Sequence, residues 1–131
     1  MTAPRIEPRE DHLLIRFEGL HAVGALRNSV VIPYSTIREA TSEPPAWPGW
    51  TSIRSLGVHI PGQMSVGTFA AKHGKRRFVD LEKGARKALH LELSGHPEFD
   101  EVEIEADMPE QIVEAIARHA PIEVQRAPVY E

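Results

Sequence analysis

The stretch "ALHLELSGHPEFDEVEIEADMPEQIVEAIA", residues 88–117, decides the fold class. Its first six residues alternate between apolar and polar positions, which is the pattern of a half-buried strand. Segment 101–106 alternates in the same way, and a turn with glycine and proline joins the two, which predicts an antiparallel hairpin. We expect the apolar residues of the second strand to point inward and its glutamates to point outward into solvent. These are Glu101, Glu103 and Glu105.

The end of the same stretch predicts an amphipathic helix. Asp107 is a candidate N-cap with Glu110 three residues further on, and Pro109 falls in the first turn, where its missing N–H is tolerated. His119 and Pro121 mark the end of the helix. The apolar face predicted from the spacing consists of Ile112, Val113, Ile116 and Ala117. Such a helix packs against a sheet.

Further strand signals lie on the N-terminal side. "MSVGTFAA" (64–71) and "RRFVDL" (76–81) flank "KHGK", which indicates a hairpin, and segment 20–28 fits a helical turn or a tight meander. "YST" (34–36) between two strand-like segments predicts a second hairpin. The seven predicted strands are 13–17, 29–33, 37–42, 64–71, 76–81, 88–93 and 101–106. Seven short, mostly antiparallel strands and one helix predict a mainly β fold, a partly open barrel capped by the helix.

The remaining segments are expected to lack regular structure. Residues 1–11 read as a flexible leader, since proline and charge dominate there, and residues 121–131 as a C-terminal tail. Between them, residues 12–120 form the single domain. Four prolines and three glycines between residues 44 and 62 predict a long, stiff loop that covers one end of the barrel.

Composition excludes several functional classes. The chain has 131 residues and no cysteine, so disulfides, thiolate zinc sites and cysteine nucleophiles are ruled out. The formal net charge of −4 argues against nucleic-acid binding, which begins with excess positive charge. No apolar run approaches the roughly 20 residues of a membrane span, and no signal peptide is recognisable, so we expect a soluble cytoplasmic protein.

Catalytic and metal-binding motifs are not recognisable in the sequence. It contains no Walker loop, no GxSxG elbow and no HExxH, and its seven histidines show no ligand spacing. The three glutamates of segment 101–106 are those of an exposed strand. We therefore predict a non-enzymatic protein with no catalytic residue, no metal site and no cofactor.

Two surfaces are candidates for binding. The tip of the hairpin carries Lys72, His73, Lys75, Arg76 and Arg77. This cluster is either a surface for an anion or a partner, or a solvated tip whose charges the acidic segment 88–117 neutralises within the molecule. In the proline-rich segment, Trp47 and Trp50, with His59, either contact a partner or plug the barrel.

Three stretches carry a resemblance to a known group. "LHAVGALRNSVVIPYSTIREA" (20–40), "HIPGQMSVGTF" (59–69) and the segments from "RRFVDL" to "EVEIEADMPEQIVEAIA" resemble small bacterial proteins with a pleckstrin-homology-like (PH-like) barrel. The resemblance implies that barrel fold and carries over no binding residue. The expected function is a binding module for a protein partner or for a second copy of the chain, through the loop and the hairpin. The alternative is a small ligand or lipid headgroup at the barrel mouth or the basic hairpin, with an anionic membrane the less favoured partner.

Overall fold

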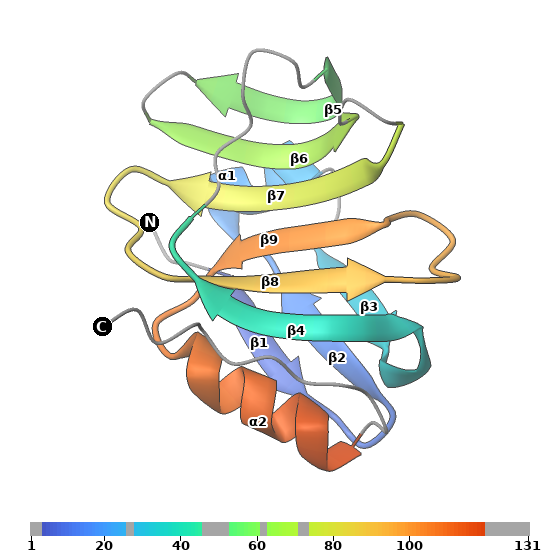
Figure 1. Ribbon diagram of the computed structural model, residues 1–131. Coiled ribbons are helices and arrows are strands. Elements are labelled where there is room, and N and C mark those ends of the chain that lie inside the picture. Colours follow the sequence, from blue (N-terminus) through green and yellow to red (C-terminus); the bar gives the residue numbers. More distant parts are fainter. Residues whose placement is uncertain (1–3, 26–27, 46–52, 61–62, 71–73, 120–131) are drawn as a thin grey trace.

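The computed structural model describes residues 4–25, 28–45, 53–60, 63–70 and 74–119, with only the backbone for residues 20, 23, 24 and 53–60. Within these ranges the chain forms two sheets (Figure 1). The three-stranded sheet has the order β1 (Arg5–Pro8), β2 (His12–Arg16), β3 (Ser29–Pro33). The six-stranded sheet has the order β4 (Ile37–Glu43), β8 (Ala88–Leu93), β9 (Glu101–Glu105), β7 (Arg76–Glu82), β6 (Met64–Ala70), β5 (Ile53–Ile60).

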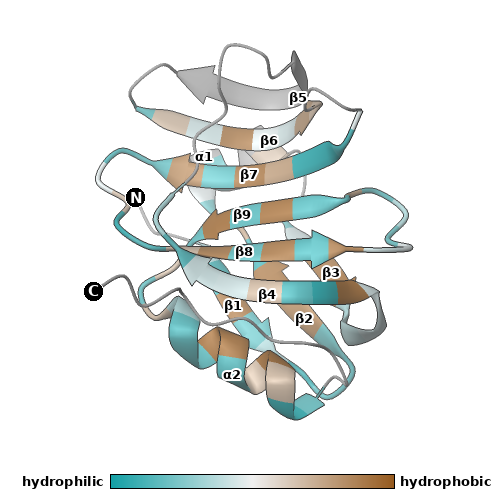
Figure 2. Cartoon of the chain, viewed as in Figure 1, coloured by the Kyte–Doolittle hydropathy of each residue, from teal (hydrophilic) through white to brown (hydrophobic). Residues whose placement is uncertain are grey.

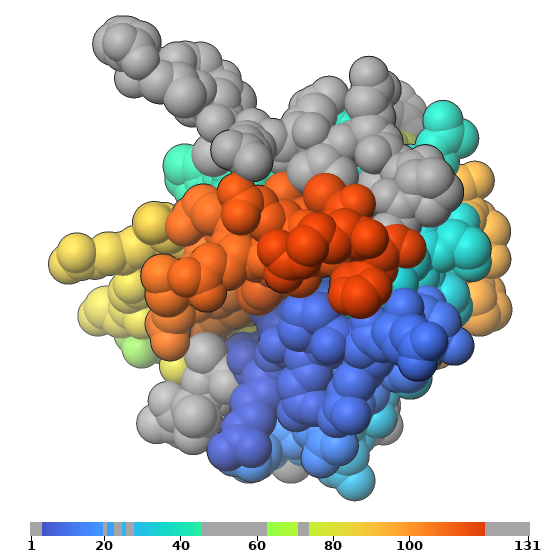
Figure 3. Space-filling view, turned by 90° about the horizontal axis from the view of Figure 1, so that it is seen from below, coloured from blue at the N-terminus to red at the C-terminus, as the bar shows by residue number. Residues whose placement is uncertain are grey.

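The main core lies between the two sheets. Figure 1 shows the three-stranded sheet behind the six-stranded one, with α1 (Gly19–Ala25) behind the upper strands and α2 (Pro109–His119) across the lower edge. Seen from below, α2 lies against the N-terminal strands (Figure 3). Apolar and polar positions alternate along β8 and β9 (Figure 2). The fully buried core side chains include Leu13, Ile15, Ile32, Leu89, Leu91, Val102, Ile104 and Ile116.

The mainly β class and the C-terminal helix are confirmed. A strand is present at each of the seven predicted positions, and both the β6–β7 and the β8–β9 hairpins are antiparallel. Residues 19–25 form a helix, one of the two alternatives for that segment. On α2 the buried face includes Val113 and Ile116 as expected, but Ala117 is exposed and Ala115 is buried in its place. In the described part of the chain, no helix has the length and apolar character needed to cross a membrane.

The predicted seven-stranded barrel is wrong. The described residues form nine strands in two separate sheets, and β7 pairs with β9 in parallel. Strand β1 lies in the expected leader, because its backbone pairs with β2 and its Ile6 packs against the core. Strand β5 lies in the expected loop, because the prolines of that segment fall outside residues 53–60 and leave its N–H groups free to pair with β6. Residues 1–3 and 121–131 lie outside the description.

The predicted hairpin of residues 29–33 and 37–42 is also wrong. β3 pairs with β2 in the small sheet, whereas β4 pairs with β8 in the large one. Between them, Tyr34–Thr36 form a short 3-10 turn in which Tyr34 is buried and its hydroxyl donates to the carbonyl of Arg9 at 2.7 Å. The buried Tyr34 side chain fixes the position of the turn at which the chain passes from the small sheet to the large one.

Candidate functional site

Strand β7 carries polar side chains on both of its faces. Side chains alternate along a strand, so Asp80 shares the face of Phe78, which belongs to the main core, while Arg77 and Val79 point to the opposite face. Val79 lies in a second buried cluster with Phe69, Leu81 and Ala88. Both faces of β7 are therefore largely buried, and its polar residues need partners on each side.

Four residues form what we call the acid–histidine site: His21, Asp80 and Glu82 on the core side of β7, and Glu105 at the end of β9. His21 comes from α1, and its Nδ1 lies 2.5 Å from Oδ1 of Asp80. Its Nε2 lies 3.2 Å from Oε1 of Glu82. The side chains of His21 and Asp80 expose only 1% and 0% of their surface. The helix that connects β2 to β3 and a strand of the large sheet are thus joined through a buried imidazole.

Two carboxylate oxygens of this site are unsatisfied. Oδ2 of Asp80 and Oε1 of Glu105 are buried and have no hydrogen-bond partner in the described structure. Candidate ligand atoms of His21, Glu82 and Glu105 all lie within 4.8 Å of one another. The site therefore contains three carboxyl groups around one imidazole, with acceptor capacity left over.

The site shifts the pKa of each of three members. Burial, together with the charges of Asp80 and Glu82, raises the pKa of Glu105 to about 7. Burial also raises the pKa of Asp80 against the opposing effect of His21. Burial by itself disfavours the imidazolium of His21, but the bonds and charges of Asp80 and Glu82 outweigh it and raise the pKa of His21. At pH values near 7, Glu105 is therefore close to the midpoint of its titration.

A cavity opens beside the site. It has a volume of about 300 Å³ and is lined by the turn Gly84–Lys87 and by residues 105–107, so Glu105 borders both the cavity and the acid–histidine site. A more open hollow of about 550 Å³ lies between β1 and α2, lined in part by Ile6 and Met108. None of the four residues of the acid–histidine site lines this larger hollow, so the smaller cavity is the one relevant to its chemistry.

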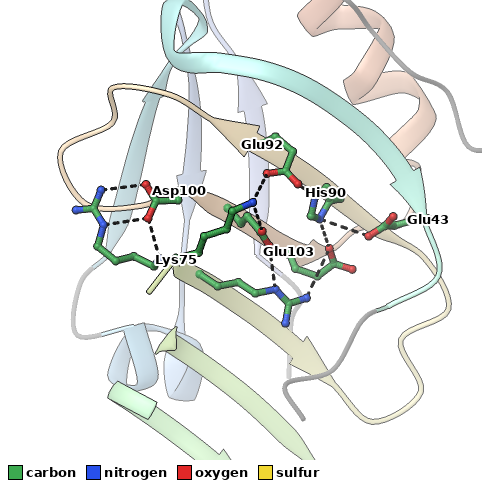
Figure 4. Close-up of polar contacts among 9 residues, drawn as sticks. Glu43, Lys75, His90, Glu92, Asp100 and Glu103 are labelled. Atoms are coloured by element: carbon green, nitrogen blue, oxygen red, sulfur yellow. Dashed lines mark hydrogen bonds and ion pairs between the residues drawn. The ribbon is translucent and has the colours of Figure 1, made fainter. Parts of the chain in front are cut away.

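On the opposite face lies a second group of charges, which we call the outer network: Glu43, Lys75, Arg77, His90, Glu92, Glu101 and Glu103. His90 Nδ1 lies 2.8 Å from Oε1 of Glu103, and Figure 4 shows Glu43, Glu92 and Glu103 around His90. Burial opposes the charged imidazole, but its hydrogen bonds with Glu103 and Glu92 raise the pKa of His90 to about 9. In this network, cations and carboxylates alternate across four neighbouring strands.

The expectation that Glu103 is exposed is wrong. Its side chain is fully buried, because His90 on β8 and Arg77 on β7 supply positive charge on either side of it. Glu101 is only partly exposed, and its carboxylate pairs with Lys75 at 3.2 Å and with Arg77 at 3.7 Å. Glu101 and Glu103 are therefore parts of an ion-pair network and not of a solvated strand face.

The predicted binding surfaces are described only in part. Lys75 and Arg77 belong to the outer network, and Arg76 pairs with Asp100 at 3.3 Å and donates to the carbonyl of Pro97. These ion pairs match the alternative of neutralisation within the molecule. Lys72, His73, Trp47 and Trp50 lie outside the described residues. His59 lies on β5 opposite Ser65, and its side chain is not described. Their role in binding stays a prediction.

Sequence reasoning missed the acid–histidine site because its parts are far apart in the chain. His21 and Asp80 are separated by 59 positions. The signal that was available is the sequence "FVDL" (78–81), where a carboxylate interrupts an apolar strand. A carboxylate in a buried strand requires a partner, and histidine is one of the few side chains that supply it.

Comparison with known proteins adds no relative from which a function can be inferred. No family model, curated protein or solved structure matches this chain. The function is therefore argued from the site itself.

Proposed function

We propose that this chain is a non-enzymatic binding module that takes up a small cation at the acid–histidine site. The observation that carries the proposal is the pair of buried, unpartnered carboxylate oxygens, Oδ2 of Asp80 and Oε1 of Glu105. An unsatisfied buried acceptor costs about 1–3 kcal/mol. A ligand that brings positive charge to these oxygens offsets that cost, so the unsatisfied acceptors of the free protein favour binding.

The charge of the site supports a cation over an anion. In the described structure, the positive partner of Asp80 and Glu82 is His21, and no lysine or arginine is paired with Asp80, Glu82 or Glu105. With carboxyl groups in a three-to-one excess over the imidazole, an anion is repelled once Glu105 loses its proton.

The dimensions of the site support binding over catalysis. A cavity of about 300 Å³ lies at the lower end of the range for small-molecule pockets. The His21 side chain is almost completely buried and Glu105 is the member of the site that borders the cavity, so the proposed ligand is an ion or a single ammonium group. A larger substrate would leave its reacting bond outside the site.

The test is a binding panel on the metal-stripped protein at pH 8. Isothermal titration calorimetry and thermal shift are measured with Zn²⁺, Mn²⁺, Mg²⁺ and methylammonium, and with sulfate as the anion. We expect saturable binding of at least one cation, weakened in Glu105→Gln and unchanged in Glu10→Gln, an exposed glutamate outside the site. The proposal fails if no cation binds, or if both variants bind as the original chain does.

A second proposal, association with a protein partner or a second copy, rests on the hairpin. Although paired, the side chains of Lys75 and Arg76 keep 52% and 44% of their surface exposed. Sedimentation of the protein alone tests self-association, and sedimentation with anionic liposomes tests whether the hairpin binds an anionic surface. A protein that sediments as a monomer and does not bind the liposomes at low salt overturns the proposal. A PH-like relationship and a cytoplasmic location also remain proposals from the sequence.

A further inference from the structure

We infer that the cation is a divalent transition metal ion, bound by Nε2 of His21 and by the carboxylates of Glu82 and Glu105. This inference rests on the proposed function and names the class of its ligand. Asp80 is a positioning residue in this arrangement: its Oδ1 contacts Nδ1 of His21, and the nearby charge of the ion offsets the burial of its unpartnered Oδ2 without a bond to the ion. The three ligands come from α1, β7 and β9.

The distances between the donor atoms fit a shared ion. Two ligand atoms bound to one ion at about 2.1 Å each lie roughly 3.0–3.5 Å apart at the angles of octahedral or tetrahedral coordination. Nε2 of His21 and Oε1 of Glu82 are already 3.2 Å apart. Candidate ligand atoms of His21, Glu82 and Glu105 all lie within 4.8 Å of one another, a separation that side-chain rotation can close. A metal ion bound here displaces to solvent any proton shared by Nε2 of His21 and Glu82.

Asp80 prepares the imidazole for this role. Its Oδ1 lies 2.5 Å from Nδ1 of His21, and Nε2 is the ring nitrogen that lies near Glu82. A carboxylate behind a ligating histidine fixes the orientation and tautomer of the ring and increases its basicity. Because both side chains are buried, the ring is held in this orientation before any ion arrives.

The ligand set favours particular metals. One imidazole nitrogen with carboxylate oxygens suits Zn²⁺, Mn²⁺, Fe²⁺ and Co²⁺, whereas Mg²⁺ and Ca²⁺ prefer oxygen ligands and bound water. Among the metals tested we therefore expect Zn²⁺ and Co²⁺ to bind more tightly than Mg²⁺ and Ca²⁺.

We do not expect the outer network to bind a metal, although its residues are similar. Glu43, His90 and Glu103 also bring donor atoms within 4.8 Å of one another. There, however, Arg77 pairs with Glu103, and His90 is hydrogen-bonded to two carboxylates. The guanidinium already neutralises the carboxylates that an ion would need. Among the described residues, no lysine or arginine is paired with a carboxylate of the acid–histidine site.

The experiment uses the full chain after removal of metal with a chelator. Calorimetry measures the binding of Zn²⁺, Co²⁺, Mg²⁺, Ca²⁺ and methylammonium, and the visible absorption of the Co²⁺ complex reports on coordination. We expect one Zn²⁺ or Co²⁺ per chain. We expect His21→Gln to lose binding, and Asp80→Asn to bind about 10- to 100-fold more weakly. His12→Gln, which changes a histidine of the small sheet, serves as the matched control.

The outcomes separate this inference from the proposed function. Methylammonium binding without metal binding overturns the inference and leaves the proposed function standing, and the absence of any cation binding overturns both. Metal binding that is equal in His21→Gln and His12→Gln also overturns the inference. If His21→Gln does not fold, paramagnetic NMR of the Co²⁺ form of the unmutated chain decides. One shifted imidazole ring supports the inference, and no shifted ring overturns it.

Discussion

Oδ1 of Asp80 lies 2.5 Å from Nδ1 of His21, and this contact joins the short helix α1 to the strand β7 in the interior of the protein. Each of the two buried side chains depends on the other for a hydrogen bond. Removal of either leaves a buried polar group with nothing to bond.

We predict that Asp80→Ala lowers the free energy of unfolding by about 1–3 kcal/mol, because the imidazole of His21 loses its buried acceptor. Urea unfolding followed by circular dichroism at pH 6.5 measures the change. Glu10→Ala, on the surface, is the control and is expected to change stability by less than about 0.5 kcal/mol. Equal effects of the two substitutions would show that the contact does not stabilise the fold.

Glu105→Gln is expected to stabilise the metal-free protein at pH 8. The folded-state pKa of Glu105, about 7, lies above its ordinary value of 4.5, so the folded protein loses stability as the pH rises from 4.5 through 7. A neutral glutamine avoids this loss, which is on the order of 2 kcal/mol. Thermal unfolding with a chelator present should show a larger gain at pH 8 than at pH 5. A gain that does not depend on pH would contradict the burial of this carboxyl group.

The outer network gives a prediction that extends to alkaline pH, and here substitution of His90 is expected to destabilise the protein and not to stabilise it. His90 has a folded-state pKa of about 9 against an ordinary 6.5, so its contribution to stability is complete below pH 6.5 and is lost as the pH rises through 9. The unfolding free energies of the original chain and His90→Gln should therefore differ more at pH 6 than at pH 10, by up to about 3 kcal/mol. NMR titration of the His90 ring gives the pKa directly, and a midpoint near 6.5 would refute the prediction.

Arg77 and Lys75 lie two residues apart but are expected to behave differently. Arg77 exposes 12% of its side chain and pairs with the buried Glu103, so Arg77→Ala leaves a buried charge and costs about 3 kcal/mol or more. Lys75→Ala removes a half-exposed charge and costs less than about 1 kcal/mol. Replacing Lys75, Arg76 and Arg77 together is therefore not a neutral way to test anion binding. Chemical denaturation of the two single variants measures the difference.

Ile116→Asp is expected to unfold the protein or to detach α2. The Ile116 side chain is fully buried in the main core, and placing a carboxylate there costs several kcal/mol. Loss of the cooperative thermal transition, or a fall in melting temperature of more than 10 °C, is the expected result. Ala117→Asp, one residue further along at an exposed position, should change the transition little.

The sequence predicts elements well where one residue pattern determines them. The alternation of residues 88–93 and 101–105 and the spacing of Val113 and Ile116 are local signals, and the structure contains the two strands and the helix that they predict. The pairing of β3 with β2 could not be read in this way, since the corner at Tyr34 depends on where a buried ring fits in the finished core.

The candidate site depends even more on tertiary structure. Glu101, Glu103 and Glu105 have the same alternation as a solvated strand face, and only neighbouring strands decide whether such a face is exposed. Placing β9 between β8 and β7 puts Glu103 beside His90 and Arg77. A periodic pattern records which residues share a face, but it does not record what covers that face.

The central position of β9 also bears on how the chain folds as it is made. β9 is the last strand in the described sequence, yet it is the strand that joins the β4–β8 pair to the β7–β6–β5 group. Before residues 101–105 leave the ribosome, the large sheet exists only as two fragments, each with an unpaired edge. The sheet therefore closes only after β9, the last described strand, has been synthesised. Until then two strand edges with unpaired N–H and C=O groups stay exposed.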